Sequence, residues 1–241
     1  MRRIILLTFI LFTPFGFLHA QKIYVLSVGV TDYPGTQSDL NLTVNDAKTI
    51  KWVYDKNKKA ETLLLTNAQA TRQNVLYHMN KLFLKATEND IVLFFFSGHG
   101  YQGGFVGYNT DLITYTDIKN IMAKSASKNK MIFADACYSG KFRESKTSSS
   151  PSVAPSDLNV LLFLSSRSNE TSIESPRMTN GFFTTYLQKA LRGNADANRD
   201  RKITAKELFT YVNKGVVDLS RGKQHPVMWG KFSDSMPVIV W

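Results

Sequence analysis

Short apolar runs alternate with longer amphipathic segments along most of this chain, and the alternation restricts the folds that it can adopt. Five runs have the length and composition of buried strands: 22–30, 62–65, 91–96, 130–134 and 159–164. Five segments are predicted as helices: 42–54, 71–85, 116–126, 181–191 and 204–219. Strands that alternate with helices form a parallel sheet that is covered on both faces. We therefore expect an α/β fold, with a mostly parallel central sheet flanked by helices on both faces.

Three further segments complete the expected organisation. Glycine and aromatic residues at 101–109 predict a hairpin, and Pro237–Trp241 predicts a last edge strand. The segment 141–157 is rich in Ser, Lys and Pro, which is typical of an exposed linker. With 241 residues and 43% hydrophobic content, the chain is long enough to bury a sizeable core. We expect one domain over 21–241.

The first twenty residues, 1–20, have the composition of a signal peptide. Arg2 and Arg3 precede an apolar stretch, and Ala20 offers a small residue for signal peptidase to cut after. The alternative is a membrane anchor, but the stretch is shorter than the ~20 residues that a spanning helix needs, and it contains a proline and a glycine. We expect cleavage near Gln21, export as a secreted or periplasmic protein, and no stable membrane anchor after cleavage.

The chain is basic, with a formal charge of +11, which falls to +9 when residues 1–20 leave with two arginines and no acid. Such a balance suits nucleic acid or an anionic surface. The lysines are scattered, however, and the sequence contains no arginine-rich arm or nucleic-acid motif. We therefore expect no nucleic acid partner, and we expect a monomer.

One cysteine, Cys137, follows the apolar run 130–134, and it cannot form an internal disulfide because the chain has no second cysteine. One histidine, His99, follows the apolar run 91–96 and is flanked by glycines. The carboxyl ends of parallel strands meet at one edge of a sheet, where sites in open α/β folds form. The spacing therefore predicts that the thiol and the imidazole meet at this edge.

A thiol attacks well only as thiolate, and a nearby imidazole accepts its proton or stabilises the anion. The backbone N–H groups of Gly98 and Gly100 are candidates for an oxyanion hole, together with the turn that follows Cys137. Two alternatives remain open. The cysteine is a buried, inert packing residue, or the pair binds metal, although a zinc site needs three or four ligands and neither CxxC nor HExxH is present.

These motifs resemble those of the caspase-type cysteine peptidases, and of the metacaspases and their bacterial relatives in particular. The resemblance rests first on Ser97–Gly100, reading SGHG, and on Asp135–Gly140, reading DACYSG. Supporting likenesses run from Lys22 to Trp241: Asp32-Tyr33, Leu42–Ala47 (LTVNDA), Ser165–Glu170 (SSRSNE) and Gly181–Thr184 (GFFT).

The resemblance implies the caspase-hemoglobinase sandwich, with a large-subunit-like part over 21–140, the linker 141–157, and a small-subunit-like part over 158–241. It implies that Cys137 is the nucleophile that forms a thioester acyl-enzyme and that His99 is the base or proton donor. The family's activity is endopeptidase cleavage of peptide or protein substrates. For this chain we expect no required cofactor.

The resemblance also implies a preference for arginine or lysine before the cut. Metacaspases recognise the basic side chain through acids that match Asp46 and Asp135, with Ser97 nearby. Two carboxylates stabilise a guanidinium or ammonium by charge-assisted hydrogen bonds and reject an acidic side chain. The alternative for Asp46 is that it only caps a helix, and the alternative for Asp135 is that it only braces a turn.

If the enzyme cuts after basic residues, the linker 141–157 is also a possible substrate of the enzyme itself. Lys141, Arg143 and Lys146 lie in it and are candidate sites of self-cleavage. The alternative is an exposed loop that nothing cuts.

One acidic segment resembles a calcium-binding loop between two helices. Asp196, Asn198, Asp200 and Glu207 stand at loop positions 1, 3, 5 and 12. Position 6, normally glycine, is Arg201, which replaces the residue of the sharp turn and adds a positive charge. A degenerate loop that joins two helices is the favoured interpretation, and Ca²⁺ binding is the alternative.

Two classes of function follow. The leading hypothesis is an exported cysteine endopeptidase that cleaves after Arg or Lys with a His-Cys dyad. The alternative is a caspase-like binding or scaffold domain whose dyad is idle. A transpeptidase using the same dyad is a third hypothesis, but it gives no function to Asp46 and Asp135.

Overall fold

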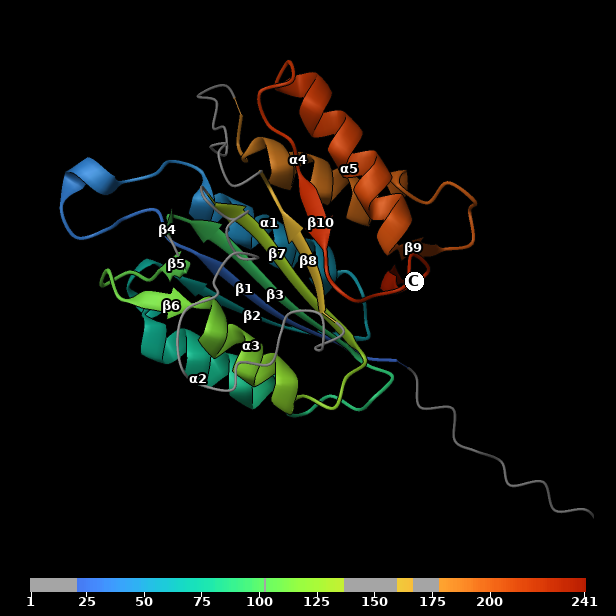
Figure 1. Ribbon diagram of the computed structural model, residues 1–241, viewed down its shortest axis with the longest axis horizontal. Helices are drawn as coiled ribbons and strands as arrows, with labels where there is room; N and C mark the ends of the chain where they lie inside the picture. Colours follow the sequence, from blue (N-terminus) through green and yellow to red (C-terminus); the bar gives the residue numbers. More distant parts are fainter. Residues whose placement is uncertain (1–20, 102, 137–159, 167–177) are drawn as a thin grey trace, which may run out of the picture.

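The computed structural model describes residues 21–101, 103–136, 160–166 and 178–241. A six-stranded sheet lies at its centre, with the strand order β10-β8-β7-β3-β1-β2 (Figure 1). Its strands are β1 (Ile23–Gly29), β2 (Ala60–Thr66), β3 (Ile91–Gly98), β7 (Asn129–Ala136), β8 (Val160–Leu164) and β10 (Val227–Trp229). All neighbours pair in parallel except β8 and β10, which are antiparallel. The predicted mostly parallel sheet is confirmed.

Helices cover both faces of this sheet, as the alternation in the sequence predicts (Figure 1). One face carries α2 (Arg72–Phe83) and α3 (Tyr115–Lys124); the other carries α1 (Thr43–Asp55), α4 (Phe182–Lys189) and α5 (Ala205–Leu219).

The apolar run of β3 supplies both cores. Phe94 and Phe96 belong to the core under α2 and α3, whereas Phe95 belongs to the core under α1, α4 and α5. Successive side chains of a strand point to opposite faces, so a strand buried on both faces has to be apolar throughout.

Threonine caps mark most of the helix starts. The side chains of Thr71, Thr114 and Thr204 accept hydrogen bonds from backbone N–H groups of α2, α3 and α5. Helix α1 has no such cap at Leu42, and instead the N–H of Val44 donates to the Thr31 hydroxyl at 3.1 Å. The predicted helix ranges agree with the observed ones to within a few residues, which is the usual uncertainty of helix ends.

Smaller elements surround the main sheet. The predicted hairpin is part of a three-stranded antiparallel sheet, β4 (Gly100–Tyr101), β5 (Gly104–Val106) and β6 (Leu112–Thr114). Short helical turns lie at Thr36–Ser38, Asn67–Gln69 and, in π form, Ala190–Asn194.

The predicted last strand forms, in a small sheet apart from the main one. Strand β11 (Pro237–Val240) pairs with β9 (Lys202–Thr204) in a separate two-stranded sheet. The edge of the main sheet is β10, which pairs antiparallel with β8. The sequence did not predict β10, because three residues are too few to show the alternation of a strand. It did predict β11, because Pro237–Val240 is a continuous apolar run.

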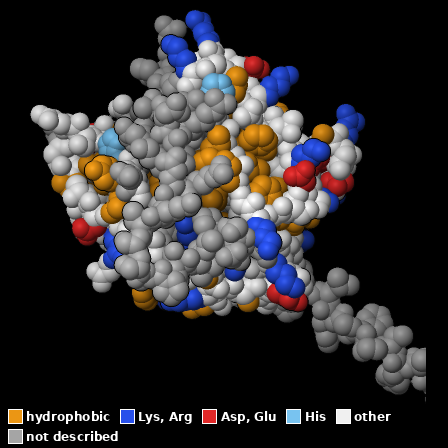
Figure 2. Space-filling view, viewed as in Figure 1, with side chains coloured by type: hydrophobic (Ala, Val, Ile, Leu, Met, Phe, Trp, Pro, Cys, Tyr) orange, Lys and Arg blue, Asp and Glu red, His pale blue; other side chains and the backbone are white. Residues whose placement is uncertain are grey.

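The described surface has scattered charge. On the face shown in Figure 2, lysine and arginine side chains are spread around the rim and interspersed with acids rather than gathered into one patch. Among the described residues, no helix is long and apolar enough to span a membrane. The expected signal peptide and the expected linker 141–157 lie outside the described residues.

Candidate active site

The carboxyl end of β3 and the carboxyl end of β7 lie side by side. Ser97 is in register with Asp135, and Gly98 is in register with Ala136. His99 follows β3 directly, and Cys137 is the residue after the end of β7. Cys137 lies outside the described residues, so the structure gives no distance between the thiol and the imidazole.

His99 is held by the segment that follows β1. Its Nε2 lies 2.7 Å from the backbone oxygen of Ser38, and its backbone N–H donates to the Tyr33 hydroxyl at 2.9 Å. A carbonyl oxygen only accepts hydrogen bonds, so Nε2 carries the hydrogen when the ring is neutral. The lone pair is then on Nδ1, and this is the nitrogen that is able to accept a proton.

Tyr33 orients the imidazole from the other side. The centroids of the two rings are 4.8 Å apart, and the Tyr33 hydroxyl donates to the oxygen of Val106 at 3.3 Å. Burial raises the pKa of Tyr33 far above its ordinary value, so the phenol stays neutral and able to donate.

The two oxyanion candidates have different surroundings. Gly98 is buried at the end of β3, and a Cβ there would lie 2.7 Å from the Tyr33 hydroxyl oxygen, so a glycine is needed for the contact that holds His99. Gly100 is half-buried at the start of β4, opposite Phe105. Both oxyanion roles stay predictions.

Asp46 does not cap α1. Its side chain is 1% exposed, and it accepts hydrogen bonds from three groups that lie far away in the sequence. These are the Ser97 hydroxyl at 2.8 Å, the Asn180 amide at 2.9 Å and the N–H of Gly181 at 3.0 Å. The interpretation that Asp46 only caps α1 is therefore wrong, and its role in binding substrate stays a prediction.

Asp135 is 5% exposed and binds the N-terminus of α4. Its Oδ2 accepts from the N–H of Thr184 at 3.2 Å and from the Thr184 hydroxyl at 2.9 Å. The N-cap residue of α4 is Gly181, which has no side chain for this purpose. Asp135 thus lies in β7 rather than in a turn, and it supplies a cap to a distant helix.

Asp46 and Asp135, the carboxylate pair, both lie close to Gly181. A Cβ built on Gly181 would lie 2.5 Å from Oδ2 of Asp135 and 3.5 Å from Oδ2 of Asp46. Burial raises the pKa of Asp46 well above its usual range, and the charge of Asp135 raises it further. Hydrogen bonds from Asn180, Ser97 and Gly181 oppose this rise. A cation placed between the two carboxylates would relieve both the repulsion and the desolvation.

The structure thus brings together three predicted substrate-binding residues, Asp46, Ser97 and Asp135, at the strand ends that carry His99 and lead into Cys137. The sequence analysis did not identify Asn180, Gly181 and Thr184 as site residues. The available signal was a glycine directly before an amphipathic helix without a side-chain cap. Lys141, Arg143 and Lys146 lie outside the described residues.

The acidic side chains of the loop 196–207 form hydrogen bonds within the loop itself. Asp196 accepts from the N–H groups of Asp200 and Arg201, at 3.2 and 3.0 Å, and Asn198 accepts from that of Asp200 at 3.0 Å. Glu207 forms a capping box with Thr204 at the start of α5. In the part of the chain that the structure describes, no group of three His, Cys, Asp or Glu side chains is arranged to hold a metal ion. The degenerate loop stays the favoured interpretation, and calcium binding stays the untested alternative.

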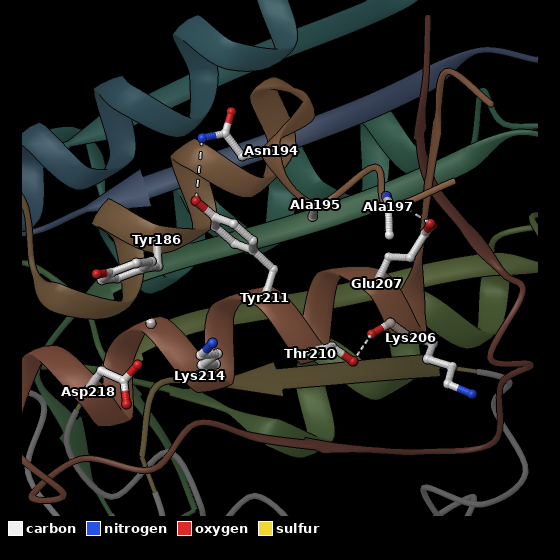
Figure 3. Close-up of a pocket in the computed structure, with 11 residues that line it drawn as sticks. Tyr186, Asn194, Ala195, Ala197, Lys206, Glu207, Thr210, Tyr211, Lys214 and Asp218 are labelled. Atoms are coloured by element: carbon white, nitrogen blue, oxygen red, sulfur yellow. Dashed lines mark hydrogen bonds between the residues drawn. The ribbon is translucent and has the colours of Figure 1, made fainter. Parts of the chain in front are cut away.

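A pocket of about 560 Å³ lies beside this loop, between α4 and α5. Tyr186, Tyr211 and Glu207 are among the residues that line it, and Asn194 donates to the Tyr211 hydroxyl at 3.4 Å (Figure 3). None of the candidate catalytic or specificity residues lines this pocket.

Comparison with known proteins identifies the family. A family model described as a caspase domain matches residues 22–236, which is most of the chain. The chain therefore belongs to the caspase-domain family of cysteine peptidases, as its motifs predict.

A solved structure agrees with this assignment at the level of the fold. The protein GSU0716 from Geobacter sulfurreducens is similar with a TM-score of 0.67 and 17% sequence identity, over 88% of this chain and 94% of that one. At this identity the likeness shows the fold alone. A search of curated proteins gave no match.

Proposed function

We propose that this protein is a cysteine endopeptidase that cleaves peptide bonds after arginine or lysine. The observation that carries the proposal is the carboxylate pair. Two buried aspartates from α1 and β7 meet around Gly181, one of them bonded to Ser97, the residue in register with Asp135. Burying two like charges is costly unless something compensates them, and a basic substrate side chain is that compensation.

The proposed chemistry uses His99 and Cys137. The Cys137 thiolate attacks the carbonyl carbon of the substrate, the C–N bond breaks, and the leaving amine takes a proton from His99. His99 then accepts a proton from water, which adds to the thioester, and cleavage of the C–S bond releases the acid and restores the Cys137 thiolate beside protonated His99. The Ser38 oxygen, which holds Nε2–H, supports this assignment because it leaves Nδ1 to exchange the proton.

The alternative is a caspase-like scaffold whose dyad is idle. Hydrolysis of arginyl, lysyl and aspartyl fluorogenic peptides by the mature protein, with and without calcium, distinguishes the two. We expect turnover of the arginyl and lysyl peptides, and none of the aspartyl peptide or of any peptide by Cys137→Ala. Absence of turnover with all three peptides would favour the scaffold.

Self-cleavage and export are parts of the same proposal. An enzyme of this specificity is able to cut its own linker after Lys141, Arg143 or Lys146, and the composition of residues 1–20 supports export. Mass spectrometry of the purified protein beside Cys137→Ala tests the first point, because identical fragments in both would rule out self-cleavage. N-terminal sequencing of protein from the growth medium or the periplasm tests the second.

A further inference from the structure

We propose that Asn180 is a positioning residue for substrate specificity, which holds Asp46 in the orientation and charge state that a basic substrate side chain needs. The inference rests on the proposed function, since it assigns a role to a residue that contacts Asp46 rather than the substrate.

Asn180 is 6% exposed and lies immediately before the N-cap of α4. Its amide nitrogen donates to Oδ1 of Asp46 at 2.9 Å and to the Thr49 hydroxyl at 3.1 Å. Its amide oxygen is 3.4 Å from the hydroxyl of Thr49 and 3.4 Å from that of Thr179. The amide plane is therefore fixed on both sides, and one N–H points at the carboxylate.

The chemistry of an amide suits this position. A hydrogen bond to a carboxylate stabilises its ionised form. A lysine or arginine here would do so as well, but its charge would neutralise Asp46 and compete with the substrate cation. An aspartate would add a third acid beside Asp46 and Asp135. A neutral donor keeps Asp46 ionised while leaving its charge for the substrate.

Asn180 also lies between Asp46 and a pocket at the surface. A pocket of about 490 Å³ opens beyond it, lined by Asn180, Thr49, Lys48 and Trp52 among others. Asp46 behind it is 1% exposed. A smaller residue would allow water to reach the carboxylate, so a substitution that tests the donor has to keep the volume of Asn180.

Every described contact of Asp46 bears on its ionisation. Asp135 on β7 is the charged group that acts on Asp46, and its negative charge raises the pKa of Asp46. Ser97 on β3, Asn180, and the N–H of Gly181 before α4 present donors, which lower it. Loss of the Asn180 donor therefore shifts the pKa of Asp46 upward and reduces its ionised fraction at a given pH.

The test is the pH profile of kcat/KM for an arginyl fluorogenic peptide, measured for the wild type and for Asn180→Asp, which keeps the volume and replaces the N–H donor with an acceptor. We expect kcat/KM at neutral pH to fall about 10-fold to 100-fold, mainly through KM, because a hydrogen bond to a charged group is lost. We also expect the acid limb of the profile to move to higher pH. Asn180→Leu has no donor and no charge, so it should lower kcat/KM in the same direction.

Thr185→Val is the matched control, because the Thr185 hydroxyl donates to the backbone oxygen of Asn180 at 3.5 Å, so its removal leaves the Asn180 amide and Asp46 untouched. We expect less than about a twofold change in kcat/KM. Alkylation of Cys137 by iodoacetamide should proceed at the wild-type rate in every variant, since Asn180 acts on specificity and not on the thiol.

The outcomes separate the inference from the proposed function. If the wild type cleaves neither arginyl nor lysyl peptides, the proposed function fails. If the wild type cleaves them and both Asn180 variants keep its kcat/KM and acid limb, the positioning role is overturned and the proposed function stands. If Asn180→Asp does not fold, Asn180→Thr, which has nearly the volume of asparagine and retains a hydroxyl donor, carries the test beside its near-isostere Asn180→Val, which has no donor: equal kcat/KM in these two variants would equally overturn the role.

Discussion

Two groups of acids in this protein show opposite uses of the same side chain. In the acidic loop 196–207, Asp200 is exposed and Asp196 and Glu207 are half-buried, and these three acids bind N–H groups no more than ten residues away. The carboxylate pair is buried, and its hydrogen-bond partners lie between 49 and 135 residues away. Hydrogen bonds between an acid and nearby residues shape a loop or cap a helix. Hydrogen bonds between an acid and residues far along the chain fix the carboxylate in the protein interior. Only in the carboxylate pair are two acids buried close enough to repel each other.

The largest expected effect is on the pair itself. Asp135→Ala should lower kcat/KM for an arginyl peptide by about 100-fold to 1000-fold, because one of two buried charges that would meet the substrate cation is lost. Circular dichroism should show a folded protein, since the lost cap of α4 is offset by relief of the repulsion on Asp46. Asp200→Ala in the acidic loop is the control and should leave kcat/KM unchanged. Wild-type activity in Asp135→Ala would show that the pair does not bind substrate.

Gly181→Ala should damage both the site and the fold. The added Cβ would meet Oδ2 of Asp135 at 2.5 Å, and overpacking of this kind costs about 1–3 kcal/mol. We expect a lower Tm and about a tenfold loss of kcat/KM for arginyl peptides.

Gly215→Ala is the matched control on α5. Its Cβ would also meet a neighbour, the Tyr186 ring, but it lies beside the pocket between α4 and α5 and away from the pair. This variant should alter Tm alone. Equal losses of activity in both glycine variants would mean that Gly181 acts only through stability.

Asp46→Asn should stabilise the protein in a pH-dependent way. The folded state raises the pKa of Asp46 above its unfolded value, chiefly by burial. The stability that this group contributes is therefore fully present below about pH 4 and is lost as pH rises through the folded pKa. The variant should be more stable than the wild type at neutral pH, and the gain should vanish below about pH 4.

Urea unfolding of the wild type and Asp46→Asn at several pH values measures this difference. Arginyl-peptide cleavage should be lost in the same variant. A difference that does not change with pH would show that Asp46 is not buried as a charged group.

The smallest effects are expected in the acidic loop. Millimolar calcium should leave Tm unchanged, because the acids already bind backbone N–H groups and four basic residues lie within the same twelve positions. Glu207→Gln keeps the capping box and should shift stability by less than about 0.5 kcal/mol. A calcium-dependent rise of Tm in the wild type that Glu207→Gln loses would establish a calcium site.

Much of the fold was predictable because it follows from local patterns. The apolar runs of β1, β3, β7 and β8 have the composition of strands buried on both faces, and the amphipathic helices lie between them. The placement of His99 and Cys137 after two such runs predicts that they meet at one edge of the sheet, and the structure shows that the two strands, β3 and β7, are neighbours. Strand β10 was not predicted, since its three residues acquire their pairing only from β8.

The sequence by itself determined the α/β fold, the family and the residue types of the site, because periodicity and motifs are local properties of the chain. Only the tertiary structure decided what the two aspartates do. Asp46 has the position of a residue near a helix start, and Asp135 that of a residue in a turn, until Asn180, Gly181 and Thr184 come from the other half of the chain to bind them. Burial and the repulsion between charges depend on distances in space, and these distances cannot be read from separation along the chain.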